Sequence, residues 1–179
     1  HGRDVSLLRP AIPMESPWFC RNKMELTFGT DATTQEVTLG MHPPGFKYEV
    51  FKMTECYLMS EESVAITVAI GEWAAKSGLS PFVRMDQPSF LRTLTIREGK
   101  RTGDRLVELT TTGDEAPDFD QQSFLDALDA TGVPISSIWW TRQHTKKGET
   151  TRFEETLLRG ADHLREELHV AGQRPLSFQ

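Results

Sequence analysis

The sequence predicts an α+β domain in which a largely antiparallel sheet of hairpins has two helices packed on one face. Three observations support this. Short segments of alternating apolar and polar residues come in pairs joined by glycine-containing turns, two segments have capped helical character, and the predicted elements follow the order β-β-β-α-β-β-α-β. The 179 residues suit one domain spanning 1–179, with the proline-containing residues 1–17 as an extended lead-in.

The N-terminal part of the sheet is predicted as a hairpin followed by a third strand. In the first strand Met24, Leu26 and Phe28 fall on one side and polar residues on the other, which is typical of a half-buried strand. Glycine-containing turns separate the segments. The predicted strands are Arg21–Phe28, Glu36–Met41 and Phe46–Met53.

Two segments predict helices. Residues 61–77 begin after Ser60, which is suited to capping, have two glutamates in the first turn and stop before Gly78. The second predicted helix, Gln121–Ala130, follows an acidic linker around Asp114–Asp118 and places its apolar residues on one side.

A second hairpin and a further strand complete the predicted sheet. Residues Phe90–Arg97 and Arg105–Thr112 both alternate, and a polar, glycine-containing link joins them. After the second helix, Ile135–Arg142 predicts another strand. In this strand Trp139 and Trp140 point to opposite faces, so at least one ring is expected to be partly exposed. That ring either packs against a neighbouring domain or covers a helix of this domain.

Composition and charge restrict the function. The net charge of −6 is the reverse of what a free-standing nucleic-acid binder usually has, so an RNA role must rest on local basic patches or on another part of a longer protein. No apolar run approaches the roughly 20 residues that span a bilayer, so no membrane partner is expected. Two cysteines are too few for a disulfide framework, which favours a reducing, cytoplasmic compartment.

Four segments carry a resemblance, and their order is hard to obtain by chance. Residues 17–29 read PWFCRNKMELTFG, and a glycine-containing strand, Leu39-Gly40-Met41, comes next, followed by Val50 and Cys56. The hairpin over 90–97 and 106–109 is the third, and residues 157–178 are the fourth. In this order they resemble the domain that precedes the methyl-transfer domain in RNA uracil-5-methyltransferases. Cys20 stands where that family usually has an aromatic residue.

The resemblance implies a central, RNA-facing domain that lacks the catalytic domain of its parent protein. In the family a cysteine thiolate attacks carbon 6 of uracil, and neither Cys20 nor Cys56 matches that position. The sequence also has no glycine-rich cofactor loop after a strand. We therefore expect no cofactor in this chain and no methyl transfer by it alone, with S-adenosylmethionine bound by the catalytic domain of the same parent chain.

The resemblance also bears on the C-terminal tail, Phe153–Gln179. Within it, Ala161–Leu168 is rich in good helix formers and follows a glycine, which favours a helix. The family resemblance implies strand or extended chain there instead. We expect extended chain.

Cys56 has two interpretations. In one branch of the family a cysteine at this place is the fourth ligand of an iron–sulfur cluster, which normally takes four thiolates. Only Cys20 precedes Cys56 in this chain, so a small buried thiol is the favoured interpretation here. The cluster role stays a hypothesis for the parent protein.

The candidate RNA-binding residues are basic or aromatic. Arg21 and Lys23 stand in the first segment of the resemblance and alternate on one predicted strand face, where they either contact RNA phosphate or pair with nearby glutamates. Arg92 and Arg97 belong to a basic segment at the second hairpin, which is more often a solvated loop. Phe90 beside it either stacks on a base or begins the core face of a strand, and the core is favoured.

Two function classes follow from these observations. The first is a non-catalytic domain of an S-adenosylmethionine-dependent RNA (uracil-5-)-methyltransferase that helps recognise a tRNA or rRNA loop. The second is an α+β protein-interaction module with no RNA role. The acidic composition favours the second class, and the ordered resemblance favours the first.

Overall fold

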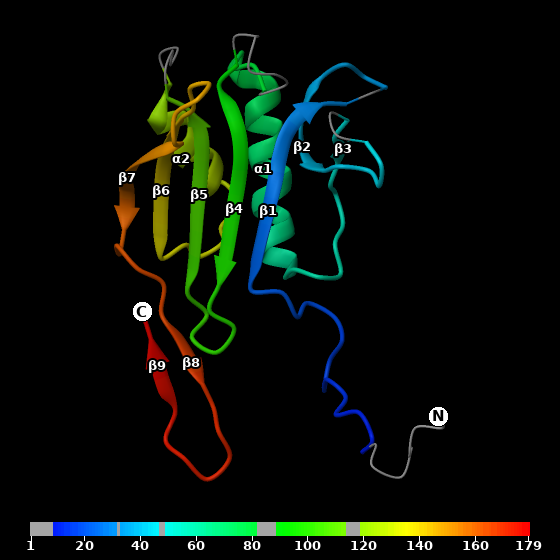
Figure 1. Ribbon diagram of the computed structural model, residues 1–179, viewed down its shortest axis with the longest axis vertical. Helices are drawn as coiled ribbons and strands as arrows, with labels where there is room; N and C mark the ends of the chain where they lie inside the picture. The colour runs from blue at the N-terminus through cyan, green and yellow to red at the C-terminus, as the bar shows by residue number, and fades with distance from the viewer. Residues whose placement is uncertain (1–8, 32, 47–48, 82–88, 114–118) are drawn as a thin grey trace.

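The computed structural model describes residues 9–31, 33–46, 49–81, 89–113 and 119–179 (Figure 1). Within these ranges the chain forms a seven-stranded sheet, a separate two-stranded hairpin and two helices. In chain order the elements are β1 (Lys23–Thr30), β2 (Val37–Met41), β3 (Phe51–Lys52), α1 (Glu61–Ser77), β4 (Leu91–Glu98), β5 (Arg105–Thr112), α2 (Gln121–Asp129), β6 (Ser137–His144), β7 (Arg152–Gly160), β8 (Glu166–Leu168) and β9 (Leu176–Phe178).

The large sheet has the strand order β3-β2-β1-β4-β5-β6-β7, and its neighbouring strands are antiparallel except for β5 and β6. That parallel pair needs a crossover, and α2 lies in the connection. Both helices lie on the same side of the sheet, behind it in Figure 1. The predicted α+β fold, with a largely antiparallel sheet and two helices on one face, is confirmed.

Alternation in the strands decides which face the helices cover. In β1 the side chains of Met24, Leu26 and Phe28 are buried, whereas Lys23 and Glu25 between them are exposed. Leu94 and Ile96 in β4 pair with Leu26 and Met24, so the apolar rows of neighbouring strands line up on the helix side. The predicted inward face of the first strand is therefore confirmed.

The ends of α1 agree with the prediction. Ser60 is the N-cap, and its hydroxyl accepts a hydrogen bond from the backbone N–H of Ser63 at 3.2 Å. Gly78 follows the helix with φ +73°, in the left-handed region that a side chain disfavours. In α2, Asp120 caps the first turn by accepting from the N–H groups of Gln122 and Ser123.

An aromatic cluster holds the two helices against the sheet. The ring of Phe119 lies 5.0 Å from that of Trp140 on β6 and 6.1 Å from those of Trp73 on α1 and Phe124 on α2. Trp73 and Phe124 also meet directly, at 5.3 Å. Aromatic pairs at these separations add to the free energy gained by burying their area. The cluster therefore joins three elements that are distant in sequence.

Most element boundaries shift by one or two residues from the predictions, and the third predicted strand differs most. The third strand was expected over Phe46–Met53, but β3 spans Phe51–Lys52, opposite Met41 and Gly40, and Glu49 forms an isolated bridge with Thr30. Residues 47–48 of that prediction lie outside the described residues, as do residues 1–8 of the lead-in and the acidic linker 114–118.

The C-terminal tail is extended, as expected, and the helical interpretation of Ala161–Leu168 is wrong. Tertiary contacts override the local helix preference. The guanidinium of Arg165 donates to Asp104 at 3.0 and 3.1 Å, and these hydrogen bonds hold the pKa of Asp104 below its usual value. The Glu166 carboxylate accepts from the backbone N–H groups of Lys100 and Arg101, at 2.6 and 3.0 Å.

The β4–β5 turn is thus the part of the domain to which the β8–β9 hairpin is hydrogen-bonded. The approach is close at Gly99, where an added Cβ would lie 2.4 Å from the carbonyl oxygen of Arg165. Figure 1 shows the hairpin extending beyond the end of the large sheet. Neither helix of the described chain combines the length and the apolar character that crossing a bilayer requires.

We predict that Phe124→Ala lowers the free energy of unfolding by about 3–5 kcal/mol, because it opens a cavity inside the aromatic cluster. Phe124 is fully buried, whereas Phe153 on β7 is 55% exposed. Phe153→Ala is therefore the matched control, expected to change stability by no more than about 0.5 kcal/mol. Urea denaturation measures both variants, and equal effects would contradict the role given to the cluster.

Candidate nucleic-acid interface

The face of the sheet opposite the helices, which we call the open face, carries the candidate site. Residues that pair across neighbouring strands point to the same face. Figure 1 views the sheet from this side, with both helices behind it. Rows of paired residues cross the open face: Lys23, Arg97 and Leu106; then Glu25, Thr95, Glu108, Trp139 and Leu157; then Thr27, Thr93, Thr110, Thr141 and Glu155.

The structure brings two of the predicted basic residues together. Lys23 on β1 and Arg97 on β4 lie directly opposite each other, and both are exposed. The ammonium of Lys23 is 3.2 Å from the Glu25 carboxylate, an exposed ion pair of little energetic weight. The two cations therefore form one small positive patch at the edge of the open face.

Arg92 does not join this patch. Regular strand alternation predicts Arg92 and Arg97 on opposite sides of the sheet, unless a bulge or a strand end near Ile96 realigns them. A register shift does occur, but at Leu91–Thr93, so Arg92 is the extra residue of the irregularity. Burial lowers the pKa of the Arg92 guanidinium, which is consistent with a half-buried position between the regular rows.

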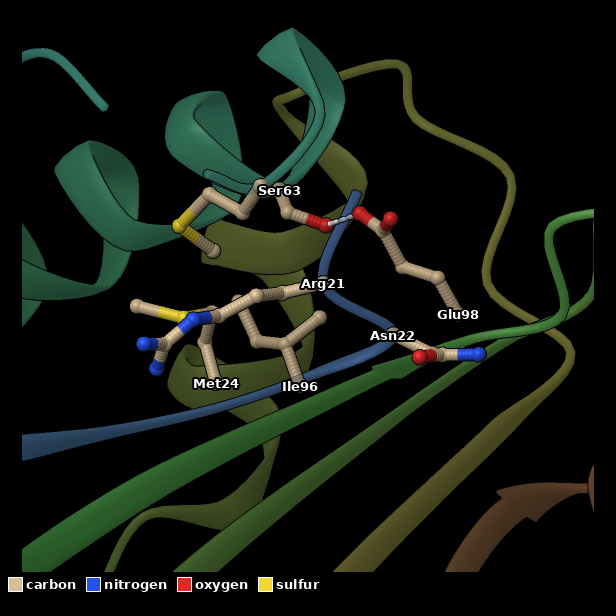
Figure 2. A pocket seen from close by; sticks show the side chains of 7 residues that line it. Arg21, Asn22, Met24, Ser63, Ile96 and Glu98 are labelled. Carbon is tan, nitrogen blue, oxygen red and sulfur yellow. Dashed lines mark hydrogen bonds between the residues drawn. The ribbon is translucent and has the colours of Figure 1, made fainter. Parts of the chain in front are cut away.

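Arg21 and Phe90 also lie elsewhere. β1 begins at Lys23, so the alternation predicted for Arg21 and Lys23 does not reach Arg21. Arg21 lines a small pocket on the helix side, where Figure 2 shows it extending toward Met24 and away from the carboxylate of Glu98. Phe90 is 1% exposed and 5.8 Å from the ring of Phe119, so it serves the core and not base stacking.

An open groove of about 210 Å³ lies beside the positive patch. It is lined by Arg97, Leu106, Glu108, Trp139, Thr141, Glu155 and Asp162. The indole N–H of Trp139 donates to the hydroxyl of Ser137 at 2.7 Å, and the hydroxyl of Thr141 donates to Glu108, also at 2.7 Å. These two hydrogen bonds fix an aromatic ring and a carboxylate in the groove.

Sequence reasoning did not find this groove. Its residues come from β4, β5, β6, β7 and the segment after β7, and only the register of four neighbouring strands places them together. The one available signal was the pair Trp139 and Trp140, which predicted an exposed ring. That prediction is confirmed for Trp139, which is half-buried, whereas Trp140 is buried on the helix side.

The pocket in Figure 2 contains a buried carboxylate, Glu98, at the N-terminus of α1. Glu98 is 6% exposed and accepts hydrogen bonds from the hydroxyls of Ser60 and Ser63 and from the ammonium of Lys100. Burial by itself would raise the pKa of this carboxyl, but these hydrogen bonds outweigh burial and hold the pKa of Glu98 below its ordinary value. Ser60, Ser63 and Lys100 all donate to this carboxylate. The ionised Glu98 therefore has a structural role, in which it links the N-terminus of α1 to β4.

The cysteines form no metal site with their described neighbours. Cys20 and Cys56 are free thiols, and no group of three or more His, Cys, Asp or Glu side chains in the described ranges is arranged to hold a metal ion. Cys56 is partly buried against the core, and its sulfur accepts from the backbone N–H of Leu58 at 3.4 Å. The iron–sulfur role of Cys56 concerns a parent protein and stays a hypothesis.

Comparison with known proteins places the chain. No family model matches it. A protein of Protochlamydia amoebophila named an uncharacterized RNA methyltransferase is 40% identical over 89% of this chain, and a protein of Chlamydia trachomatis with the same description is 32% identical over 94%. This chain is related to RNA methyltransferases. The resemblance to RNA methyltransferases seen in the sequence is confirmed.

A solved structure agrees with the fold. The crystal structure of Pyrococcus abyssi tRNA (uracil-54, C5)-methyltransferase in complex with S-adenosyl-L-homocysteine superposes with a TM-score of 0.60 over 87% of this chain, at 20% identity. At that identity the likeness concerns the fold. The chain spans 34% of that structure, and 38% and 45% of the two chlamydial relatives.

We predict that Glu98→Gln lowers stability at neutral pH by about 1–3 kcal/mol, because the amide presents donors to donors. The native pKa of Glu98 is depressed, so its ionised form contributes stability above the unfolded pKa of about 4.3, and this contribution is lost as the pH falls through the native pKa. Urea denaturation from about pH 7 to pH 3 should therefore show a smaller acid-induced loss in the variant than in the wild type.

The exposed Glu72 on α1 provides the control. Glu72→Gln removes the same charge and should leave the shape of the pH profile unchanged. If the profiles of Glu98→Gln and the wild type fell in parallel below about pH 4.3, Glu98 would not be the ionised, hydrogen-bonded group described above.

Proposed function

We propose that this chain is the RNA-facing, non-catalytic domain of an S-adenosylmethionine-dependent RNA (uracil-5-)-methyltransferase. It helps hold a tRNA or rRNA loop in the cytoplasm while the catalytic domain of the same parent chain binds the cofactor and transfers the methyl group. The relationship to RNA methyltransferases supports the substrate class, and the likeness in fold to a tRNA (uracil-54, C5)-methyltransferase supports the uracil-5 chemistry.

The observation that carries the proposal is the pairing of Lys23 with Arg97 beside an open groove. Two adjacent cations on one exposed face can contact neighbouring phosphates of a single strand, whereas scattered cations on a body of net charge −6 cannot collect enough phosphates to bind. The groove beside them contains an aromatic ring, the feature on which unpaired RNA bases stack.

One observation favours the protein-interaction alternative. The open face also carries carboxylates and two exposed apolar side chains, Phe153 and Leu157 on β7. A face with this composition fits a protein surface that is partly basic and partly apolar. The RNA titrations below separate the two functions, because the alternative predicts no binding of stem-loops at any salt concentration.

We predict that the double substitution Lys23→Ala and Arg97→Ala weakens the binding of a uridine-containing stem-loop severalfold. It should also flatten the slope of log Kd against log salt concentration by about one to two units, since each lost phosphate contact removes about 0.7. Fluorescence anisotropy at several salt concentrations measures both quantities. An unchanged slope would identify the pair as ordinary surface charge.

The control is Lys146→Ala with Lys147→Ala, in the turn between β6 and β7. This pair changes the net charge by the same amount but does not line the groove. We expect the control to change the salt slope by less than half as much as the open-face pair. Equal changes would indicate attraction to the overall charge of the chain in place of a defined contact.

We further predict that the 179-residue chain binds no S-adenosylmethionine and transfers no methyl group to RNA by itself. The sequence lacks the glycine-rich loop between a strand and a helix that cradles such cofactors, and it lacks a matching nucleophile. Titration calorimetry with the cofactor tests the first claim. Micromolar binding would contradict it.

A further inference from the structure

The groove on the open face holds charged groups that have not paired with one another. The side chains of Arg97 and Glu155 have no hydrogen-bond or ion-pair partner among the residues the structure describes, although both line this groove. Glu108 receives one hydrogen bond, from Thr141, on one carboxylate oxygen. The groove therefore presents unused donors and unused acceptors to whatever enters it.

The aromatic wall of the groove is held in place before any ligand arrives. Trp139 is half-buried, its indole N–H is engaged by Ser137, and Glu108 and Leu157 flank it on the neighbouring strands. A ring fixed in this way loses little conformational entropy when a second planar ring stacks on it. The volume of about 210 Å³ is below the roughly 300–1,000 Å³ of pockets for drug-sized ligands, which suits a single ring system.

The charge of the groove selects which part of an RNA enters. Glu108, Glu155 and Asp162 supply three carboxylates against the guanidinium of Arg97, so a phosphate group is repelled from the groove beyond the end where Arg97 adjoins Lys23. A base edge is neutral and is not repelled. Its N–H groups suit carboxylate acceptors, and its carbonyl oxygens suit a guanidinium.

We propose that this groove binds the edge of an unpaired guanine or uracil base, with the ring stacked on Trp139. Guanine and uracil carry a ring N–H next to a carbonyl oxygen, which matches Glu108 as acceptor and Arg97 as donor. In the same orientation of the ring, adenine and cytosine would place a bare ring nitrogen against the carboxylate and an amino group against the guanidinium, so both contacts would be mismatched. The inference rests on the proposed RNA-binding function and adds to it a preference for one class of base.

The test uses four stem-loop RNAs with the same stem and an all-adenine loop, in which the central loop position is adenine, cytosine, guanine or uracil. Affinities are measured by fluorescence anisotropy for the 179-residue chain and its variants. We expect the wild type to bind the guanine and uracil loops about tenfold more tightly, since a specific base contact contributes about 1–3 kcal/mol. The indole N–H resonance of Trp139, assigned by its loss in Trp139→Phe, should shift on binding.

Two variants divide the proposed interactions. Glu108→Gln keeps the size of the side chain but replaces one carboxylate oxygen by an N–H donor, so it should abolish the preference by weakening the guanine and uracil loops and strengthening the adenine and cytosine loops. Trp139→Leu should weaken all four loops about tenfold, because stacking contributes about 1–3 kcal/mol per base whatever its identity. Glu149→Gln, on an exposed residue of the β6–β7 turn, controls for the loss of one negative charge. Circular dichroism shows whether each variant is folded. If Trp139→Leu does not fold, the result for Glu108→Gln alone tests the base-edge site.

The outcomes separate this inference from the function beneath it. Equal affinity for the four loops in the wild type, or a base preference that survives Glu108→Gln, overturns the base-edge site and leaves RNA binding by Lys23 and Arg97 standing. Failure of the wild type to bind any of the four RNAs overturns both and favours a protein partner for the open face.

Discussion

Contacts among aromatic rings decide which face of this sheet is covered by the helices and which face stays open to a ligand. Phe119 meets Trp140 on the sheet, Trp73 on α1 and Phe124 on α2, so the same cluster that attaches one helix attaches the other. Because these rings all lie on the helix side, the opposite side of β4, β5 and β6 carries polar, charged and partly exposed residues without a covering helix. The open face is thus a consequence of how the core is built.

The register of the strands brings charged and aromatic side chains that are far apart in an acidic sequence together on the open face. Lys23 and Arg97 are 74 positions apart in sequence but opposite each other in the sheet, and Glu108 and Trp139 are brought beside them by β5 and β6. On the proposed function, the positive charge at the edge would suit phosphate and the carboxylates in the groove would suit base edges. On the same proposal, a net charge of −6 is compatible with RNA contact, since nonspecific attraction would be weak and binding would depend on the few groups in position.

Local signals predicted much of the fold. The helix over residues 61–77 and the strand Arg105–Thr112 were predicted with the bounds that the structure has, because capping residues and alternation act over a few positions. The path of Ala161–Leu168 was not decided by its helix formers, since Arg165 and Glu166 bond to a turn about 60 positions earlier. The candidate site depended on long-range register throughout: one bulge at Leu91–Thr93 and a strand that begins at Lys23 removed Arg92 and Arg21 from the predicted face.

The β8–β9 hairpin has no buried residue, and its described attachment to the rest of the chain is a set of polar contacts at the β4–β5 turn. Opening these contacts exposes little apolar surface, so the hairpin can detach and return without unfolding the sheet. We therefore expect its backbone amides to exchange hydrogen with solvent by local opening, and those of the buried strands β4 and β5 to exchange much more slowly. The β4–β5 turn alone sets the direction of this hairpin. The hydrogen bonds between Arg165 and Asp104 hold the hairpin against that turn, and breaking them would release it.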